Sequence, residues 1–261
     1  MIRRTVLALS LLVAIARPAH ALDPAVEEVQ QCARRNLPEH SARQEILLES
    51  TDAGGAAQRI EAELLWRRTE AGRSQLRVSV QAPPDVRGTS FLLLEREGGA
   101  DMFSYLPELG RPRRLTGRSI SGSLFGTDFS YEDLERIQLT AESTGIERLA
   151  DAEIGGRKVS VLAAKVPPET ESAYQRIVSY VDRETCVPLQ TDLEGKDGTV
   201  AKRVTAPFAE VKQVGTRWVP HRLEIEEQES GRRTTLTVRK IDLDQKLSPS
   251  EFSEAALTKG R

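Results

Sequence analysis

The residue types that perform catalysis are scattered in this sequence. His40 and His221 lie far apart, and no recognisable motif surrounds either of them. The sequence contains no G-x-S-x-G elbow, no Walker loop and no H-E-x-x-H helix. Carboxylates are numerous, but none lies in a recognisable catalytic setting. We therefore predict a protein that is not an enzyme and that needs no cofactor.

Three carboxylates close together, Asp128, Glu132 and Asp133, are the best candidates for a metal site. Their spacing matches no known metal-binding loop. Ser130 and Asp133 instead fit the pattern of a capping box, and the acids of a first helical turn face the positive end of the helix dipole. We predict a helix start at this point and no metal, with a metal site as the alternative.

The segment 101–137, which contains these acids, reads as an apolar flap beside a sheet. It opens with an expected strand that carries Phe103 and Tyr105. After a turn and a group of arginines, residues 119–126 combine serines and glycines with Ile120, Leu124 and Phe125. One interpretation is a lid that leaves a cavity when a ligand enters. The other is a single helical turn packed permanently on the sheet.

The arginines of this segment crowd one turn. Arg111, Arg113 and Arg114 are the candidates for contact with an anion, which could belong to a lipid headgroup, an acidic partner or a membrane surface. The alternative is a solvated loop whose charges pair with the nearby acids at 128, 132 and 133.

Large apolar residues on the expected strands and in the flap either line a ligand cavity or fill a core. The candidate cavity and lid residues are Trp66, Phe91, Leu93, Phe103, Tyr105, Ile120, Leu124, Phe125 and Phe129. Trp218 has the same two interpretations.

The elements that must position these residues are mostly strands. Period-two alternation, as in Ile60, Ala62, Leu64 and Trp66, indicates strands with one apolar and one solvated face. About ten such strands follow in sequence order, and we expect a meander. Helices are expected after Asp23-Pro24 and after Ser248-Pro249. The fold class is mainly β: a curled antiparallel half-barrel whose few helices cover an apolar concave face. Two smaller domains are possible at this length. The absence of a linker, however, favours a single domain that spans residues 22–261.

The first 21 residues read as a signal peptide. Arg3 and Arg4 precede an apolar run over 6–16, and Ala19-His20-Ala21 fits an A-x-A cleavage site, with cleavage after Ala21. The run is shorter than the ~20 residues that span a bilayer, so a transmembrane anchor is the less favoured alternative. Removing residues 1–21 leaves 34 basic and 39 acidic side chains, a net charge of −5, which argues against binding to nucleic acid.

The chain has two cysteines, Cys32 and Cys186. In the oxidising compartment that a signal peptide indicates, a lone pair usually forms a disulfide. Two buried free thiols are the alternative. Redox catalysis is not expected, because no C-x-x-C motif is present.

Several segments resemble the LolA-like outer-membrane lipoprotein-sorting proteins of Gram-negative bacteria. The matching residues are Tyr105-Leu106-Pro107, Arg113-Arg114, the run 126–133, Pro83 to Gly88, Tyr180-Val181-Asp182, Pro188-Leu189 and Trp218-Val219-Pro220.

This resemblance implies a LolA/LolB-like half-barrel in the periplasm, with an apolar cavity that holds lipid or lipoprotein acyl chains on their way towards the outer membrane. The branch resembles a divergent group associated with inner-membrane exporters of the resistance-nodulation-division (RND) superfamily. An alternative function is therefore that of an accessory module that binds such an exporter and carries no lipid. In the founding carrier a strand arginine bonds to a helix to hold the lid, and no motif here gives the position of that arginine.

Overall fold

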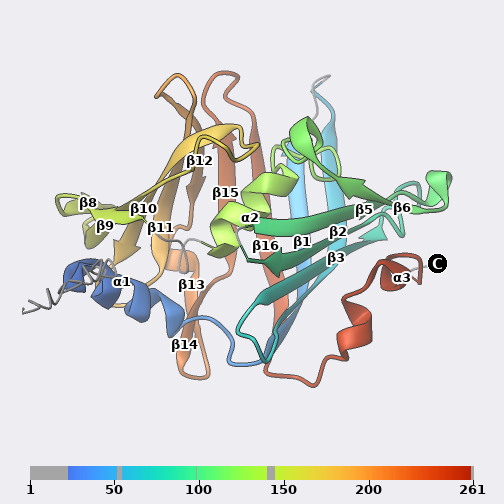
Figure 1. The fold of residues 1–261 in the computed structure, drawn as a ribbon, viewed down its shortest axis with the longest axis horizontal. Helices are drawn as coiled ribbons and strands as arrows, with labels where there is room; N and C mark the ends of the chain where they lie inside the picture. The colour runs from blue at the N-terminus through green and yellow to red at the C-terminus, as the bar shows by residue number, and fades with distance from the viewer. Residues whose placement is uncertain (1–22, 52–54, 98, 140–144, 260–261) are drawn as a thin grey trace, which may run out of the picture.

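The computed structural model describes residues 23–51, 55–97, 99–139 and 145–259, and one long, curled antiparallel sheet dominates it (Figure 1). The N-terminal half contributes β1 (Ser41–Thr51), β2 (Ala57–Arg68), β3 (Ser74–Ala82), β4 (Ser90–Arg96), β5 (Gly99–Tyr105) and β6 (Pro112–Leu115). The C-terminal half contributes β7 (Ile146–Arg148), β8 (Ala152–Ile154), β9 (Arg157–Lys165), β10 (Tyr174–Asp182), β11 (Pro188–Gly195), β12 (Val200–Thr205), β15 (Arg222–Glu227) and β16 (Arg233–Leu243). The expected half-barrel of antiparallel strands is confirmed.

The strand order differs from the expected simple meander. It runs β6-β5-β4-β3-β2-β1-β16-β15-β12-β11-β10-β9-β7, with β8 paired to β9. β1 pairs with β16 along its length, from Ala42 opposite Leu243 to Ser50 opposite Thr234. The first and last strands of the chain therefore meet in the middle of the sheet, while β6 and β7 form its edges and leave the half-barrel open.

The strand count also exceeds the expected ten, because the structure contains short strands that local alternation does not reveal. β13 (Val211–Val214) and β14 (Arg217–Pro220) form a separate hairpin, and β14 ends just before β15. The single-turn helices η1 (Pro107–Leu109), η2 (Gly117–Ser119), η3 (Phe208–Glu210) and η4 (Pro249–Glu251) lie in connections.

Two helices cover the concave face, as expected. α1 (Pro24–Arg34) begins at Asp23, whose side chain accepts a hydrogen bond from the backbone N–H of Ala25 at 2.9 Å. Its residues Val26 and Val29 pack against Leu162 and Val181. α2 (Tyr131–Leu139) lies within the curl of the sheet (Figure 1). No described helix has the length and apolar character needed to cross a membrane.

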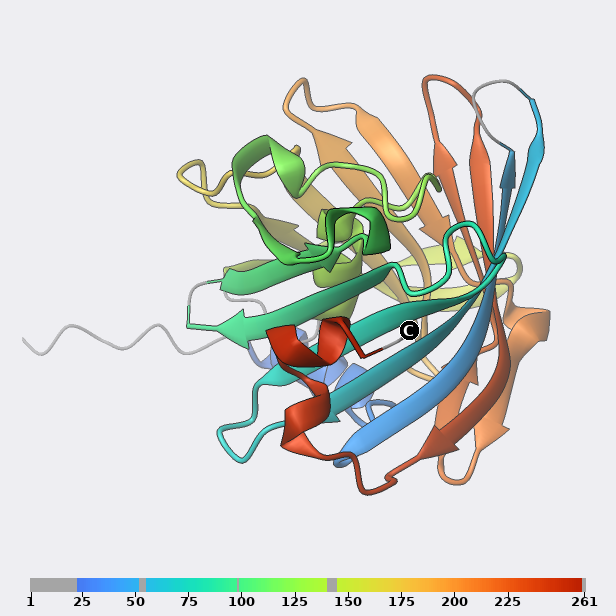
Figure 2. The same ribbon diagram turned by 90° about the vertical axis from the view of Figure 1, so that its right-hand side faces the viewer.

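The C-terminal segment covers the opposite face. α3 (Glu254–Leu257) lies on the outside of the sheet, across the strands of the N-terminal half (Figure 2). Phe252 and Leu257 form a cluster with Leu65 and Leu92 there. This second covered face explains why β4 is apolar on both sides: Phe91 and Leu93 face the main core, whereas Leu92 and Leu94 face the C-terminal segment.

Candidate ligand-binding cavity

The concave face holds a cavity of about 270 Å³. Its wall is built from β1, β2, β9, β10, β11, β12, β15 and β16, and it is covered by α1, α2 and β14. Every described residue that lines it is apolar or neutral and polar, with no Asp, Glu, Lys, Arg or His among them. The volume is close to the lower end of the ~300–1,000 Å³ of small-molecule pockets. Such an arrangement suits an uncharged, apolar guest.

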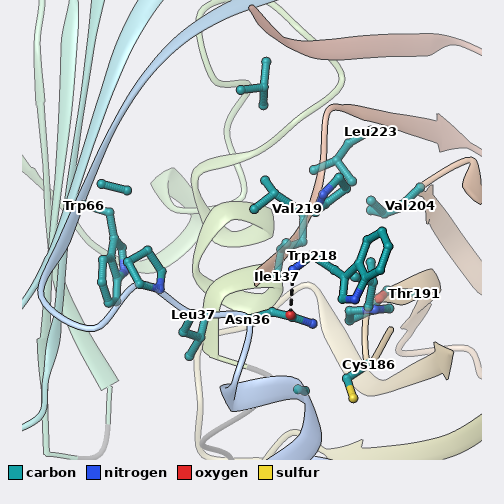
Figure 3. A pocket seen from close by; sticks show the side chains of 18 of the residues that line it. Asn36, Leu37, Trp66, Ile137, Cys186, Thr191, Val204, Trp218, Val219 and Leu223 are labelled. Carbon is teal, nitrogen blue, oxygen red and sulfur yellow. Dashed lines mark hydrogen bonds between the residues drawn. The ribbon is translucent and has the colours of Figure 1, made fainter. Parts of the chain in front are cut away.

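The two tryptophans of the chain both line this cavity. Trp66 comes from β2 and Trp218 from β14, and the close view shows them on opposite sides of the space, with Ile137 of α2 between them (Figure 3). Trp66 is almost fully buried, whereas Trp218 is half-buried. Intrinsic fluorescence should therefore report directly on what enters the cavity.

A clamp fixes α1 at one end of the cavity. Asn36, just after the helix, donates from Nδ2 to the carbonyl oxygen of Thr185 at 2.7 Å and accepts at Oδ1 from the backbone N–H of Trp218 at 2.9 Å (Figure 3). Cys32 and Cys186 form a disulfide with their Cα atoms 5.3 Å apart, so the predicted pairing is confirmed. Helix α1, the loop before β11 and the β13–β14 hairpin are thereby held together.

Helix α2 is anchored by a buried ionic group at its start. The predicted capping box is present: the Ser130 backbone N–H donates to Asp133 Oδ2 at 2.7 Å, and the Asp133 N–H donates to Ser130 Oγ at 3.1 Å. Lys202 on β12 donates from Nζ to Asp133 Oδ2 at 2.8 Å and to the Asp128 carbonyl at 2.7 Å. A strand cation therefore bonds to the start of this helix. It is a lysine and not an arginine, and no sequence motif marks its position.

The phenol of Tyr174 completes the environment of Asp133. It donates to Asp133 Oδ1 at 2.6 Å. Burial first, and then the adjacent carboxylate, raises the pKa of Tyr174, so the group stays protonated and remains a donor.

The neighbouring acids are also satisfied by protein groups. Glu132 accepts from the backbone N–H of Ala173 at 3.0 Å and pairs with Arg136 at 3.3 Å. Asp128 accepts from Thr234 Oγ1 at 2.8 Å and lies 3.4 Å from Arg232. In the part of the chain that the structure describes, no group of three His, Cys, Asp or Glu residues could hold a metal ion. These acids also make no ion pair with the arginines at 111, 113 and 114, contrary to the solvated-loop alternative.

The structure divides the predicted cavity residues into three places. Trp66 and Phe129 line the cavity. Phe91, Leu93 and Leu124 are buried in the main core beside it, and Ile120 and Phe125 are half-buried against that core. Phe103 and Tyr105 lie on the outer face with Phe252 and Leu257, away from the cavity, because alternation along β5 turns them to the face that the C-terminal segment covers.

The predicted lid, Ile120 to Phe125, is held to its surroundings by backbone contacts. The Leu124 N–H donates to the Phe129 carbonyl at 2.7 Å, and Gln58 Nε2 donates to the Phe125 carbonyl at 3.0 Å. Opening as a lid remains a prediction, which Phe125→Asp tests. Weaker ligand uptake at an unchanged midpoint of urea unfolding would support a lid, and unchanged uptake would exclude Phe125 from one.

The arginines of the predicted contact do not line the cavity: Arg113 and Arg114 lie on edge strand β6, and Arg111 lies just before it. Arg111, Arg113 and Arg114 are all exposed. Arg114 pairs with Asp101, whereas Arg111 and Arg113 make no ion pair with any residue in the described ranges. Next to them, Leu106 and Leu109 are among the most exposed large apolar residues described, at 37% and 47%.

Sequence reasoning missed several residues of the cavity and its anchor, notably Asn36, Ser179, Thr191 and Lys202. A signal existed for two of them. Ser179 lies in the period-two apolar set of Ile177 and Val181, and Lys202 pairs with Leu193 in register on the core face. A polar residue on an otherwise apolar face marks a position with a specific partner.

Comparisons with known proteins agree with this architecture. A family model described as "-like: Uncharacterized protein" matches residues 72–259, most of this chain. A search of curated proteins finds no match.

Solved structures share the fold over nearly all of their own length. An outer-membrane lipoprotein-sorting protein domain, so assigned, from Vibrio parahaemolyticus is 24% identical, covers 89% of this chain and 98% of its own, and superposes with a TM-score of 0.78. A DUF1329 family protein from Desulfovibrio piger gives 20% identity, the same coverages and a TM-score of 0.81. A LolA superfamily protein from Nitrosomonas europaea gives 19% identity, coverages of 88% and 98%, and a TM-score of 0.69.

The curled sheet with helices over an apolar cavity is a LolA-like fold, shared with the solved lipoprotein-sorting and LolA superfamily structures. This chain belongs to the family whose model matches residues 72–259.

Proposed function

We propose that this protein is a periplasmic carrier that binds lipid or lipoprotein acyl chains in its cavity for transport towards the outer membrane. The observation that carries the proposal is the cavity of about 270 Å³ on the concave face, without a charged lining residue among those described. An acyl chain gains ~0.8 kcal/mol for each CH₂ transferred from water into such surroundings. A protein of this design needs little polar specificity to hold its cargo.

The carrier proposal predicts that acyl chains reach both tryptophans. Titration with a brominated acyl chain should quench the fluorescence of Trp66 and Trp218, because both line the cavity. Ala33→Phe, which places a ring at the half-buried lining position on α1, should weaken this binding. Ala25→Phe, at an exposed position of the same helix, is the matched control. Equal binding by the two variants would contradict the proposal.

The native cargo can be identified by mass spectrometry of lipid that co-purifies with protein taken from the native periplasm. The same sample tests localisation, because its N-terminal peptide should begin at Leu22. Met1 to Ala21 lie outside the described residues, so the signal peptide remains a prediction from sequence.

One observation favours a second candidate function, an accessory module that binds an RND-superfamily exporter. Arg111 and Arg113 are exposed and have no ionic partner among the residues that the structure describes, and they adjoin the exposed Leu106 and Leu109. The double variant Arg111→Glu/Arg113→Glu distinguishes the two functions, with the exposed Arg35→Glu as control. Loss of exporter binding with intact lipid uptake would support the module, and loss of uptake would assign the arginines to lipid headgroups.

A further inference from the structure

The hydroxyl of Ser179 is an anomaly in the apolar wall of the cavity. Ser179 lies in the middle of β10 and is 1% exposed. It lines the cavity, yet no group in the described part of the chain hydrogen-bonds to its Oγ. Buried hydroxyls almost always have a partner, so an unsatisfied one calls for an explanation.

A second hydroxyl lies beside it. Thr191 of β11 is the cross-strand neighbour of Ser179, and it also lines the cavity and is only 8% exposed. Directly opposed residues on one face of an antiparallel pair have Cβ atoms ~4.5–5.5 Å apart, so two such side chains can contact one group of a guest. On the other side of Ser179 stands Leu162 of β9, which is apolar. On this side the two hydroxyls are therefore bounded by an apolar side chain.

The lining also restricts the charge of the guest. No described cavity residue carries a charge, and the amide of Asn36 is already engaged by Thr185 and Trp218. An ionised carboxylate at this depth would lose its hydration without gaining a cation. A neutral acceptor, in contrast, could receive a hydrogen bond from a hydroxyl that otherwise has none.

We propose that Ser179 and Thr191 form a subsite that donates hydrogen bonds to the ester carbonyl of an acylated ligand and selects it over a free fatty acid. This inference rests on the carrier function proposed above and names the chemistry of the cargo. Glycerolipids and the lipidated ends of lipoproteins both carry this ester.

The test uses the full mature chain and measures the quenching of tryptophan fluorescence. The two probes are a brominated acyl methyl ester and a brominated alkane of equal chain length, which lacks the ester. Ser179→Ala/Thr191→Val should weaken ester binding at least about 2- to 13-fold, the range that corresponds to the loss of one neutral hydrogen bond. Alkane binding should be unchanged or tighter. Ser74→Ala removes a buried hydroxyl outside the cavity lining and should alter neither affinity. In the unaltered protein, the corresponding free acid should bind more weakly than the ester at pH 7.

Ester binding that is insensitive to the double variant, while both probes still bind, overturns the subsite and leaves the carrier function standing. Absence of quenching by both probes overturns the carrier function and the subsite with it. The single variants Ser179→Ala and Thr191→Val repeat the measurement if the double variant does not fold.

A monoacylglycerol and a synthetic diacylated lipopeptide then separate the two sources of the ester. The ligand whose affinity falls more in the double variant identifies the class of molecule that supplies the ester. Equal affinities of both ligands for the variant and the unaltered protein would overturn the proposal.

Discussion

At the scale of single residues, Lys202 has the largest predicted effect. Its ammonium group pairs with Asp133, whose side chain is fully buried at the start of α2. Lys202→Met leaves this carboxylate without its cation, and breaking a buried pair from one side costs about 3–5 kcal/mol of unfolding free energy. Urea unfolding measures this loss. Lys212→Met, from an exposed pair with Glu210, should change stability by less than about 1 kcal/mol. Similar losses in both variants would contradict the anchor role of Lys202.

Asp182 should account for part of the loss of folding stability of this protein at acidic pH. Burial alone would raise its pKa, but hydrogen bonds from Arg157 and Thr185 outweigh burial and lower the pKa to about 2. Because the folded-state pKa lies below the unfolded-state value, Asp182 contributes stability above about pH 4 and loses it as the pH falls to about 2. The contribution is on the order of 2 kcal/mol.

Asp182→Asn should therefore be less stable than the unaltered protein at pH 7, and the difference should shrink between pH 4 and pH 2. Urea unfolding at several pH values measures it. Glu184 is the other carboxylate that bonds to Arg157, and its side chain is exposed. Glu184→Gln should therefore have little effect on stability. A difference that does not vary with pH would show that Asp182 acts through something other than its charge.

At the scale of elements, the disulfide ties α1 to the cavity. It closes a sequence separation of 154 residues, and on chain-entropy grounds its removal costs up to about 5 kcal/mol. Cys32→Ser/Cys186→Ser should also speed amide hydrogen exchange in α1 more than in β1, because Cys32 lies on α1 and its bond to Cys186 joins this helix directly to the loop before β11. Reduction of the unaltered protein should give the same pattern. Unchanged exchange in α1 would mean that the Asn36 clamp alone suffices to hold it.

Elements governed by local patterns could be predicted from the sequence. Alternation along β2 revealed its two faces, and Asp23 and Ser130 marked helix starts, because these signals depend on neighbours within a few residues. The disulfide followed from compartment and cysteine number.

Long-range arrangement could not be predicted in this way. Phe103 and Tyr105 alternate like cavity residues, but only the position of the C-terminal segment shows that their face is the outer one. Likewise, Lys202 meets Asp133 through a long-range contact that no local pattern specifies.

At the scale of the whole molecule, the β6 edge of the half-barrel is protected against unwanted pairing. β6 contains Pro112, Arg113 and Arg114, and proline and charge are the usual means of blocking an exposed strand edge. This provides a structural role for the arginines that does not depend on any partner. Because the outer side of this edge strand pairs with no described strand, the sheet does not close into a complete barrel, whose width would be fixed.

The size of the cavity makes a final prediction about the length of its cargo. Each added CH₂ in a series of brominated acyl methyl esters should tighten binding by ~0.8 kcal/mol, about fourfold in affinity, while it is buried. Once the cavity of about 270 Å³ is filled, further carbons should remain in water and the affinity should level off. Tryptophan quenching across the series locates the plateau, and Ala33→Phe should move it to a shorter chain. A steady rise without a plateau would show that the open sheet widens to admit longer chains, and affinity independent of length would place the chains outside the cavity.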